Sequence, residues 1–99
     1  MSFAEDRIKS RRLFVLRLLV EARKEANESV LFGQMKKGGF SLDTRDDVRK
    51  DLDHLRTRRC TTEEWLHPEV CVVKLTQRGE DAAYGRIEVD GVEASIWDR

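Results

Sequence analysis

The sequence predicts an α+β fold that is mostly helical, with a three-helix core, a β-hairpin, a short C-terminal helix and an extended tail. Two observations predict it. Apolar residues recur at helical spacing in three segments between residues 5 and 58. Two short extended runs then flank His67-Pro68-Glu69, the arrangement of a hairpin with a three-residue tip. The chain has 99 residues, which is the size of one domain.

Charge is abundant, balanced overall and unevenly distributed. Charged residues make up 38% of the chain, and 19 basic side chains are matched by 19 acidic ones, so no net field attracts a polyanion. Residues 1–60 hold 15 Lys and Arg against 10 Asp and Glu, a net charge of +5. Residues 61–99 hold 4 against 9, a net charge of −5. One part of the chain is therefore basic and the other acidic.

The chain carries no pattern of a membrane or exported protein. The longest apolar run, Leu13 to Val20, is interrupted by Arg17 and is too short to cross a bilayer. The first residues show no secretory signal, and two cysteines are too few for a disulfide scaffold. We therefore expect a cytoplasmic protein with no membrane partner.

The first predicted helix covers residues 5–26 and is apolar almost all round. Ile8, Val15 and Leu19 fall in one narrow sector, and further apolar residues extend that surface. A helix of this kind is buried on more than one side. It is interpreted as a central core helix or as the seam of a homodimer, in which a second copy covers the other side. The two interpretations are compatible. The predicted dimer contacts are Phe14 and Leu18 on this helix and Ile96 and Trp97 in the tail.

The second and third predicted helices have clear ends. Asn27 is the predicted N-cap of a helix that stops at Gly38-Gly39. Thr44 followed by Asp47 resembles a capping box at the start of a third helix, over residues 45–58. The inner face of this third helix is predicted to be Val48, Leu52 and Leu55.

The two extended runs, residues 61–66 and 70–76, pair about the hairpin tip. This register places Trp65 opposite Cys71 and puts Cys60 on a different face of the ribbon, so a disulfide is not expected. No His or carboxylate has a ligand-like spacing to the cysteines, so no metal site is expected either.

Residues 76–85 form a last predicted helix, with a threonine cap and a glycine stop, before a tail that lacks a helical pattern. We divide the chain into a domain of residues 1–85 and an extended tail of residues 86–99. The order of elements, three helices followed by a two-stranded wing, is that of the winged helix-turn-helix.

Four stretches carry a resemblance to known families. An apolar strand that ends in Leu-Thr-x-x-Gly, here Leu75-Thr76-Gln77-Arg78-Gly79, is frequent in bacterial winged-helix regulators. More closely, the chain resembles a family of small winged-helix proteins of Mu-like transposable phages and prophages. The resemblance implies the winged-helix architecture, and that family is described mostly by its fold. The other stretches that carry it are Asn27-Glu28-Ser29-Val30-Leu31, Asp47-Val48-Arg49-Lys50-Asp51-Leu52, and Gly85-Arg86 through Asp90-Gly91-Val92.

The third predicted helix is a candidate for reading double-stranded DNA. In this hypothesis it lies in the major groove, the second helix crosses the backbone, and the wing touches a flanking phosphate or the minor groove. Guanidinium groups suit contacts with guanine edges and phosphates. The predicted function is a transcriptional regulator of phage or prophage type, acting as a dimer with residues 44–58 as the recognition helix. The predicted DNA contacts are Lys36, Lys37, Thr44, Arg45, Arg49, Lys50 and Arg56.

Two features favour a different interpretation. Asp46 and Asp53 share the outermost face of this helix with Lys50, and ion pairs with nearby cations describe an ordinary solvated surface. The wing carries three glutamates and no Lys or Arg before Lys74, whereas DNA-binding wings typically have a basic tip. The alternative function is a non-enzymatic protein-interaction or assembly module that uses the same fold. Its predicted apolar contacts are Trp65, Val92, Ile96 and Trp97.

An enzymatic function is not predicted. His54 and His67 have no nucleophile or carboxylate at an interpretable spacing, and Gly38-Gly39 lacks the preceding strand of a phosphate-binding loop. Arg58-Arg59 precedes Cys60, and positive charge lowers the pKa of a neighbouring thiol, but a redox role also needs a resolving partner. No catalytic residue and no cofactor is expected.

Overall fold

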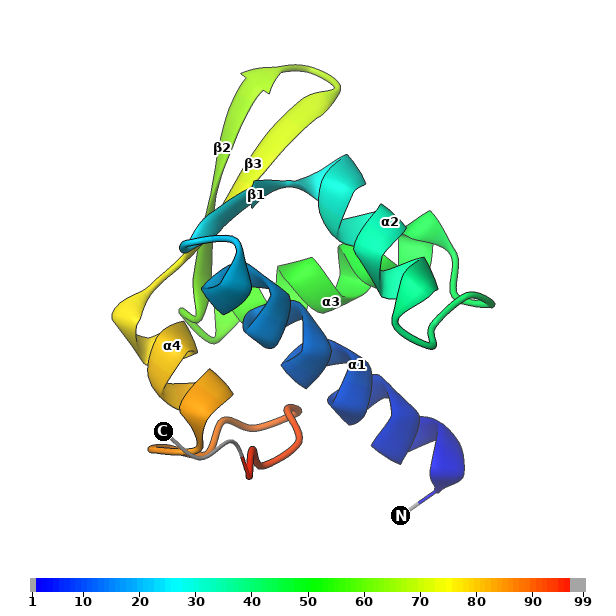
Figure 1. Cartoon of the computed structure of the whole chain (residues 1–99), viewed down its shortest axis with the longest axis vertical. Helices are drawn as coiled ribbons and strands as arrows, with labels where there is room; N and C mark the ends of the chain where they lie inside the picture. Colours follow the sequence, from blue (N-terminus) through cyan, green and yellow to red (C-terminus); the bar gives the residue numbers. More distant parts are fainter. Residues whose placement is uncertain (1, 97–99) are drawn as a thin grey trace.

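The computed structural model describes residues 2–96, which form an α+β fold of four helices and a three-stranded antiparallel sheet (Figure 1). About half of these residues are helical. The α2, α3 and α4 helices and the hairpin agree with the sequence-based expectation. The helices are α1 (Phe3–Glu21), α2 (Glu28–Lys37), α3 (Arg45–Thr57) and α4 (Gln77–Tyr84), and the strands are β1 (Glu25–Asn27), β2 (Thr61–His67) and β3 (Val70–Leu75).

β3 is the middle strand of the sheet, and the β2–β3 hairpin, called the wing below (residues 61–75), projects away from the helices (Figure 1). Trp65 pairs with Cys71, as predicted, and the register shifts beyond this pair. Buried and half-buried residues alternate along β3, which is the pattern of a strand with one face on the core. β2 lies at an edge of the sheet, and its last four residues are exposed.

α1 ends at Glu21 rather than at residue 26, so the predicted end of this helix is wrong and β1 was missed. Lys24 N donates a hydrogen bond to Leu19 O (2.7 Å), which closes the helix. Arg23 and Lys24 have positive φ angles of 62° and 81°, a left-handed conformation in which a helix does not continue. β1 then pairs with β3. Pairing in the sheet therefore overrides the helical periodicity that extends to residue 26.

The core lies between the four helices and the inner face of the sheet. The predicted inner face of α3 is confirmed, because Val48, Leu52 and Leu55 are at most 1% exposed. None of residues 7–20 of α1 is exposed, so this helix is buried on more than one side, as predicted for a core helix. The other apolar residues of the core are Leu13, Val15, Leu16, Leu19, Leu31, Met35, Cys60, Cys71, Val73, Leu75, Ala82, Ala83, Val89 and Val92.

The predicted helix caps are present. Asn27 Oδ1 accepts a hydrogen bond from Ser29 N (2.7 Å) at the start of α2. At the start of α3, Thr44 Oγ1 accepts from Asp47 N (3.1 Å) while Asp47 Oδ2 accepts from Thr44 N (2.9 Å), which completes the capping box. Gly85 ends α4 with φ at 81°, where a side chain would collide with the backbone of the tail.

A buried ion pair joins α1 to α3, and the sequence patterns did not reveal it. The fully buried carboxylate of Asp51 accepts hydrogen bonds from Nε and Nη2 of Arg11 and from Nε of Arg12. Arg11 also donates to Asp43 (2.9 Å), in the loop before α3. These contacts fix the position of α3 on α1.

Residues 86–96 of the tail fold back over α1 and α4 (Figure 1). Val89 and Val92 are buried. Arg12 Nη1 donates to Gly91 O (3.1 Å), and Ser95 Oγ donates to Ala83 O (2.6 Å). The tail therefore covers one side of α1 within the same chain.

Candidate nucleic-acid interface

α3 runs from the loop after α2 to the base of the wing (Figure 1). At its start Arg45 contacts α2, and further along Arg49 and Arg56 contact β2. These cations therefore differ in what they bind. The exposed residues of α3 are Arg45, Asp46, Lys50, Arg56 and Thr57.

Two predicted DNA contacts from different helices meet at one aromatic ring. The guanidinium carbon of Arg45 lies 5.4 Å from the centroid of Phe32, and Lys36 Nζ lies 5.2 Å from the same centroid. Arg45 Nη2 also donates a hydrogen bond to Ser29 Oγ (2.6 Å). Cation–π contacts with Phe32 hold both charges at the surface without neutralising them. The junction of α2 and α3 therefore presents two positively charged groups.

Lys37 is exposed at the end of α2, and Lys50 is exposed on α3. Asp46 is exposed in the first turn of α3, and Thr44 caps that helix. The hydrogen bonds between Thr44 and Asp47 lower the pKa of the Asp47 carboxyl. Thr44 is therefore exposed, and its side chain caps α3.

Arg49 is enclosed by carboxylates from three elements. Its guanidinium contacts Glu28 at the start of α2 (2.9 Å), Asp53 one turn along α3 (3.0 Å) and Glu63 on β2. Burial by itself lowers the pKa of Arg49, but the hydrogen bond and the charges of these carboxylates outweigh burial and raise it. The predicted DNA contact at Arg49 therefore lies inside an ion-pair cluster.

Glu63 connects Arg49 to Arg56. Its Oε1 accepts a hydrogen bond from Arg56 Nη1 (3.0 Å), and its Oε2 accepts from Arg49. Asp53 also contacts Arg56 (3.1 Å). The Glu63 side chain is only 4% exposed, whereas that of Arg56 is 47% exposed. Two of the seven predicted DNA contacts thus bind the wing of their own molecule.

The outer end of the wing is apolar and acidic. Trp65 and Leu66 are 53% and 63% exposed, and Val30 on α2 is 56% exposed. The guanidinium of Arg49 lies 5.9 Å from the Trp65 ring. Glu64 is exposed and pairs with Lys74 (2.9 Å), so the one basic residue of β3 is matched by a carboxylate.

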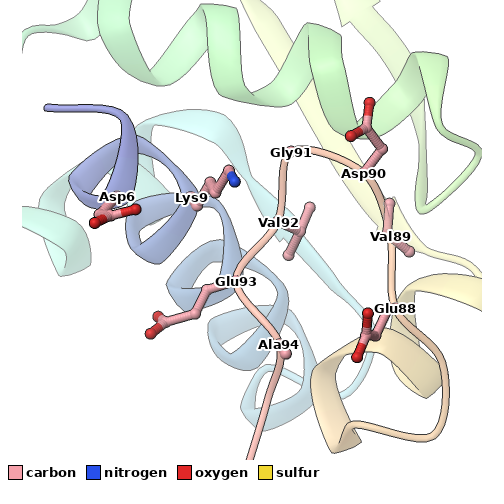
Figure 2. A pocket seen from close by; sticks show the side chains of 9 residues that line it. All are labelled: Asp6, Lys9, Glu88, Val89, Asp90, Gly91, Val92, Glu93 and Ala94. Atoms are coloured by element: carbon pink, nitrogen blue, oxygen red, sulfur yellow. The ribbon is translucent and has the colours of Figure 1, made fainter. Parts of the chain in front are cut away.

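A polar hollow on another side of the molecule lies between the N-terminal half of α1 and the tail (Figure 2). Carboxylates predominate among its charged side chains, so the hollow does not suit a polyanion. Beside the hollow, the His54 ring contacts the backbone of the tail, with Nε2 2.8 Å from Asp90 O. The lining residues are Asp6, Lys9, Glu88, Val89, Asp90, Gly91, Val92, Glu93 and Ala94.

The cysteines are buried and free. Burial raises the pKa of the Cys60 thiol, although the charge of Arg78 acts in the opposite direction. Burial also raises the pKa of Cys71. At Cys60, removal from water therefore outweighs the neighbouring positive charge.

The four predicted dimer contacts differ in their surroundings. The Phe14 ring packs on Phe40, with centroids 5.4 Å apart, and Leu18 is partly buried against the core of the same chain. Ile96 is 93% exposed. Trp97 lies outside the described residues.

Sequence reasoning missed several residues at this surface. Phe32 and Ser29 position the cation of Arg45, and Glu28 and Glu63 position Arg49. The spacing of Ser29, Phe32 and Lys36, three and four residues apart on α2, is a signal that they share a face. Glu63 lies on β2, beyond the turn that ends α3, so no helical spacing connects it to that helix.

No helix within residues 2–96 is long and apolar enough to span a bilayer. Over the same residues, no group of three or more His, Cys, Asp or Glu side chains has the arrangement of a metal site.

Two proteins are similar to this chain over most of its length. Gp26 of Escherichia phage Mu, an uncharacterized protein, is 42% identical over 83 residues, which is 84% of this chain and 84% of that protein. An uncharacterized protein of Haemophilus influenzae is 38% identical over 78 residues, which is 79% of this chain and 76% of that protein. No family model matches the chain, and no solved structure matches it.

Proposed function

This chain belongs to the family of the Escherichia phage Mu protein gp26, and from that premise we propose that it is a non-enzymatic winged-helix protein that binds double-stranded DNA. The proposed role is transcriptional regulation of phage or prophage type, in the cytoplasm, with α3 as the recognition helix. The order of elements supports the winged-helix assignment, because α2 and α3 are followed directly by the β2–β3 hairpin and β1 completes the sheet.

The observation that carries the DNA proposal is the basic junction of α2 and α3. Arg45 and Lys36 share the Phe32 ring, and their contacts with it leave both positive charges available to phosphates. Lys37 and Lys50 add two more exposed cations. Each phosphate that a cation neutralises releases counterions, so four contacts give a slope of log K against log salt of roughly −3 to −4.

In this proposal the predicted contacts are divided between two tasks. Lys36, Lys37, Arg45 and Lys50 bind DNA, and Thr44 orients the start of α3. Arg49 and Arg56 hold the wing in place through Glu63. The wing itself is not a phosphate-binding element here, since its exposed charges include carboxylates and its basic residue, Lys74, pairs with Glu64.

The proposal includes a homodimer, because one short recognition helix gives little sequence specificity. Two copies related by a two-fold axis read a palindromic site with twice the contacts. The exposed Ile96 in the tail supports a contact between the ends of the two chains.

The test removes two positive charges from α3 and compares the result with a matched change elsewhere. We expect wild-type protein to bind a random duplex with an affinity that falls steeply between about 50 and 200 mM salt. Arg45→Ala/Lys50→Ala should reduce the magnitude of the salt slope by about 2, because it removes two contacts. The control, Arg78→Ala/Arg86→Ala, removes the same charge from exposed positions on and after α4 and should keep the wild-type slope.

Fluorescence anisotropy with a labelled duplex measures these affinities, and circular dichroism confirms that the variants are folded. Absence of salt-dependent binding by the wild-type protein would overturn the DNA proposal. So would equal slopes for the α3 variant and the α4 control.

The exposed wing supports a second candidate function, a protein-interaction or assembly module. Trp65 and Leu66 are more than half exposed beside acidic residues, which is unusual for a surface that contacts DNA. If the DNA test fails, Trp65→Ala/Leu66→Ala should abolish association with a partner protein while Arg45→Ala/Lys50→Ala leaves it unchanged.

A further inference from the structure

From Arg49 onward, α3 is held by a cluster of five charged side chains from three elements. Arg49 and Arg56 supply two positive charges, and Glu28, Asp53 and Glu63 supply three negative ones. The cluster therefore has a formal charge of −1, although it contains two of the arginines that helical spacing places next to the DNA-facing surface.

Glu63 is the central member of this cluster. One carboxylate oxygen binds Arg49 and the other binds Arg56, and its side chain is the least exposed of the five, at 4%. A carboxylate and a phosphate offer a guanidinium the same pair of acceptor oxygens. Glu63 thus occupies the two arginines in the way that a DNA phosphate would.

We propose that Glu63 of the wing is an autoinhibitory group that competes with DNA phosphates for Arg49 and Arg56. This inference rests on the proposed function and adds a regulatory element to it. In the free protein, Arg45, Lys50 and the two lysines of α2 make the first contacts with DNA. Arg49 and Arg56 join them only when they exchange Glu63 for a phosphate.

The surroundings of the two arginines permit this exchange. Arg56 is half exposed, and Arg49 retains 24% of its side-chain exposure beneath Trp65. Neither residue belongs to the apolar core, so rotation of the two side chains leaves the packing of α3 intact. Any condition that weakens the contact with Glu63 should therefore increase DNA affinity without unfolding the domain.

The experiment compares Glu63→Gln with Glu64→Gln, its neighbour on β2. Both changes remove one negative charge from the same strand, but Glu64 pairs with Lys74 and not with α3. E63Q should gain two phosphate contacts. Raising the salt from about 50 to 200 mM should therefore weaken its DNA binding about tenfold more than it weakens that of the wild type. E64Q should keep the wild-type slope.

A combined variant checks that the arginines are responsible. In Glu63→Gln/Arg49→Ala/Arg56→Ala the steeper slope should return to the wild-type value. Asp53→Asn, which removes the second carboxylate shared by the two arginines, should change the slope in the same direction as E63Q. It serves as a second test if E63Q fails to fold, because Asp53 is half exposed.

The outcomes separate this inference from the proposed function. If the wild type binds DNA and neither E63Q nor D53N has a steeper slope than E64Q, the autoinhibitory role is overturned and the DNA proposal remains. A steeper slope that persists without Arg49 and Arg56 also overturns it. If no variant binds DNA, both proposals fail.

Discussion

Asp51 shows how much one side chain contributes to the arrangement of this molecule. It is fully buried, and it accepts hydrogen bonds from two arginines of α1. Burial alone lowers the pKa of Arg11, but the hydrogen bond with Asp51 and the nearby carboxylates raise it, so the arginine stays charged. A buried ion pair adds little stability over an apolar pair, but removal of one partner leaves an uncompensated charge.

Asp51→Ala should therefore lower the free energy of unfolding by about 3–5 kcal/mol. Urea denaturation followed by circular dichroism measures this change. Asp46→Asn, at an exposed position on the same helix, is the control and should stay within about 0.5 kcal/mol of the wild type. A loss below about 1 kcal/mol for Asp51→Ala would show that Asp43, the second carboxylate bound to Arg11, is enough to compensate its charge.

At the scale of the element, the start of α3 depends on its capping box. The hydrogen bonds of Thr44 lower the pKa of Asp47, so the charged carboxylate stabilises the folded state. This contribution is complete above the ordinary pKa of an aspartate and disappears as the pH falls through the lower pKa of the folded state. The sequence predicted this box correctly, because it involves residues three apart.

Asp47→Asn should lower the free energy of unfolding at neutral pH by about 0.3–1 kcal/mol, since it removes the charged half of the capping box and leaves the Thr44 cap in place. The difference from the wild type should shrink as the pH falls through the lowered pKa of Asp47, because the wild-type carboxylate is then protonated as well. Urea titrations at neutral and acidic pH measure the difference. A constant difference across this range would show that the Asp47 carboxylate makes no contribution through the box.

At the scale of the whole molecule, ion pairs fold the acidic part of the chain onto the basic part. Glu63 binds Arg49 and Arg56, Asp90 binds Arg58 (2.9 Å), and Glu80 binds Lys24 (3.2 Å). The net charges of +5 and −5 in the two parts of the sequence therefore do not become two opposite poles. At the junction of α2 and α3, Lys36, Lys37, Arg45 and Lys50 remain exposed.

The proposed homodimer is tested at this scale by sedimentation. At a concentration on the order of 10 μM, a stable dimer should have twice the mass of the 11.6 kDa chain. Ile96→Asp should shift it toward the monomer, because a charge in an apolar contact is costly. Leu42→Asp is the matched control, since Leu42 is 91% exposed in the loop before α3. A monomeric wild-type protein would contradict the dimer.

The sequence by itself determined the local structure: the ends of α2, α3 and α4, the caps at Asn27, Thr44 and Thr76, and the pairing of Trp65 with Cys71. These features arise from residues that are close together in the chain, so spacing and turn residues report them. They also specify which face of α3 is buried.

Only the tertiary structure decided where α1 ends and what the charged side chains bind. β1 forms because β3 is there to pair with it, and Asp51 finds Arg11, 40 residues away. Arg49 meets Glu63, 14 residues away, because the base of the wing lies beside α3. Charges in a sequence do not identify their partners, since an ion pair forms between groups that packing brings together and not between groups at a fixed spacing.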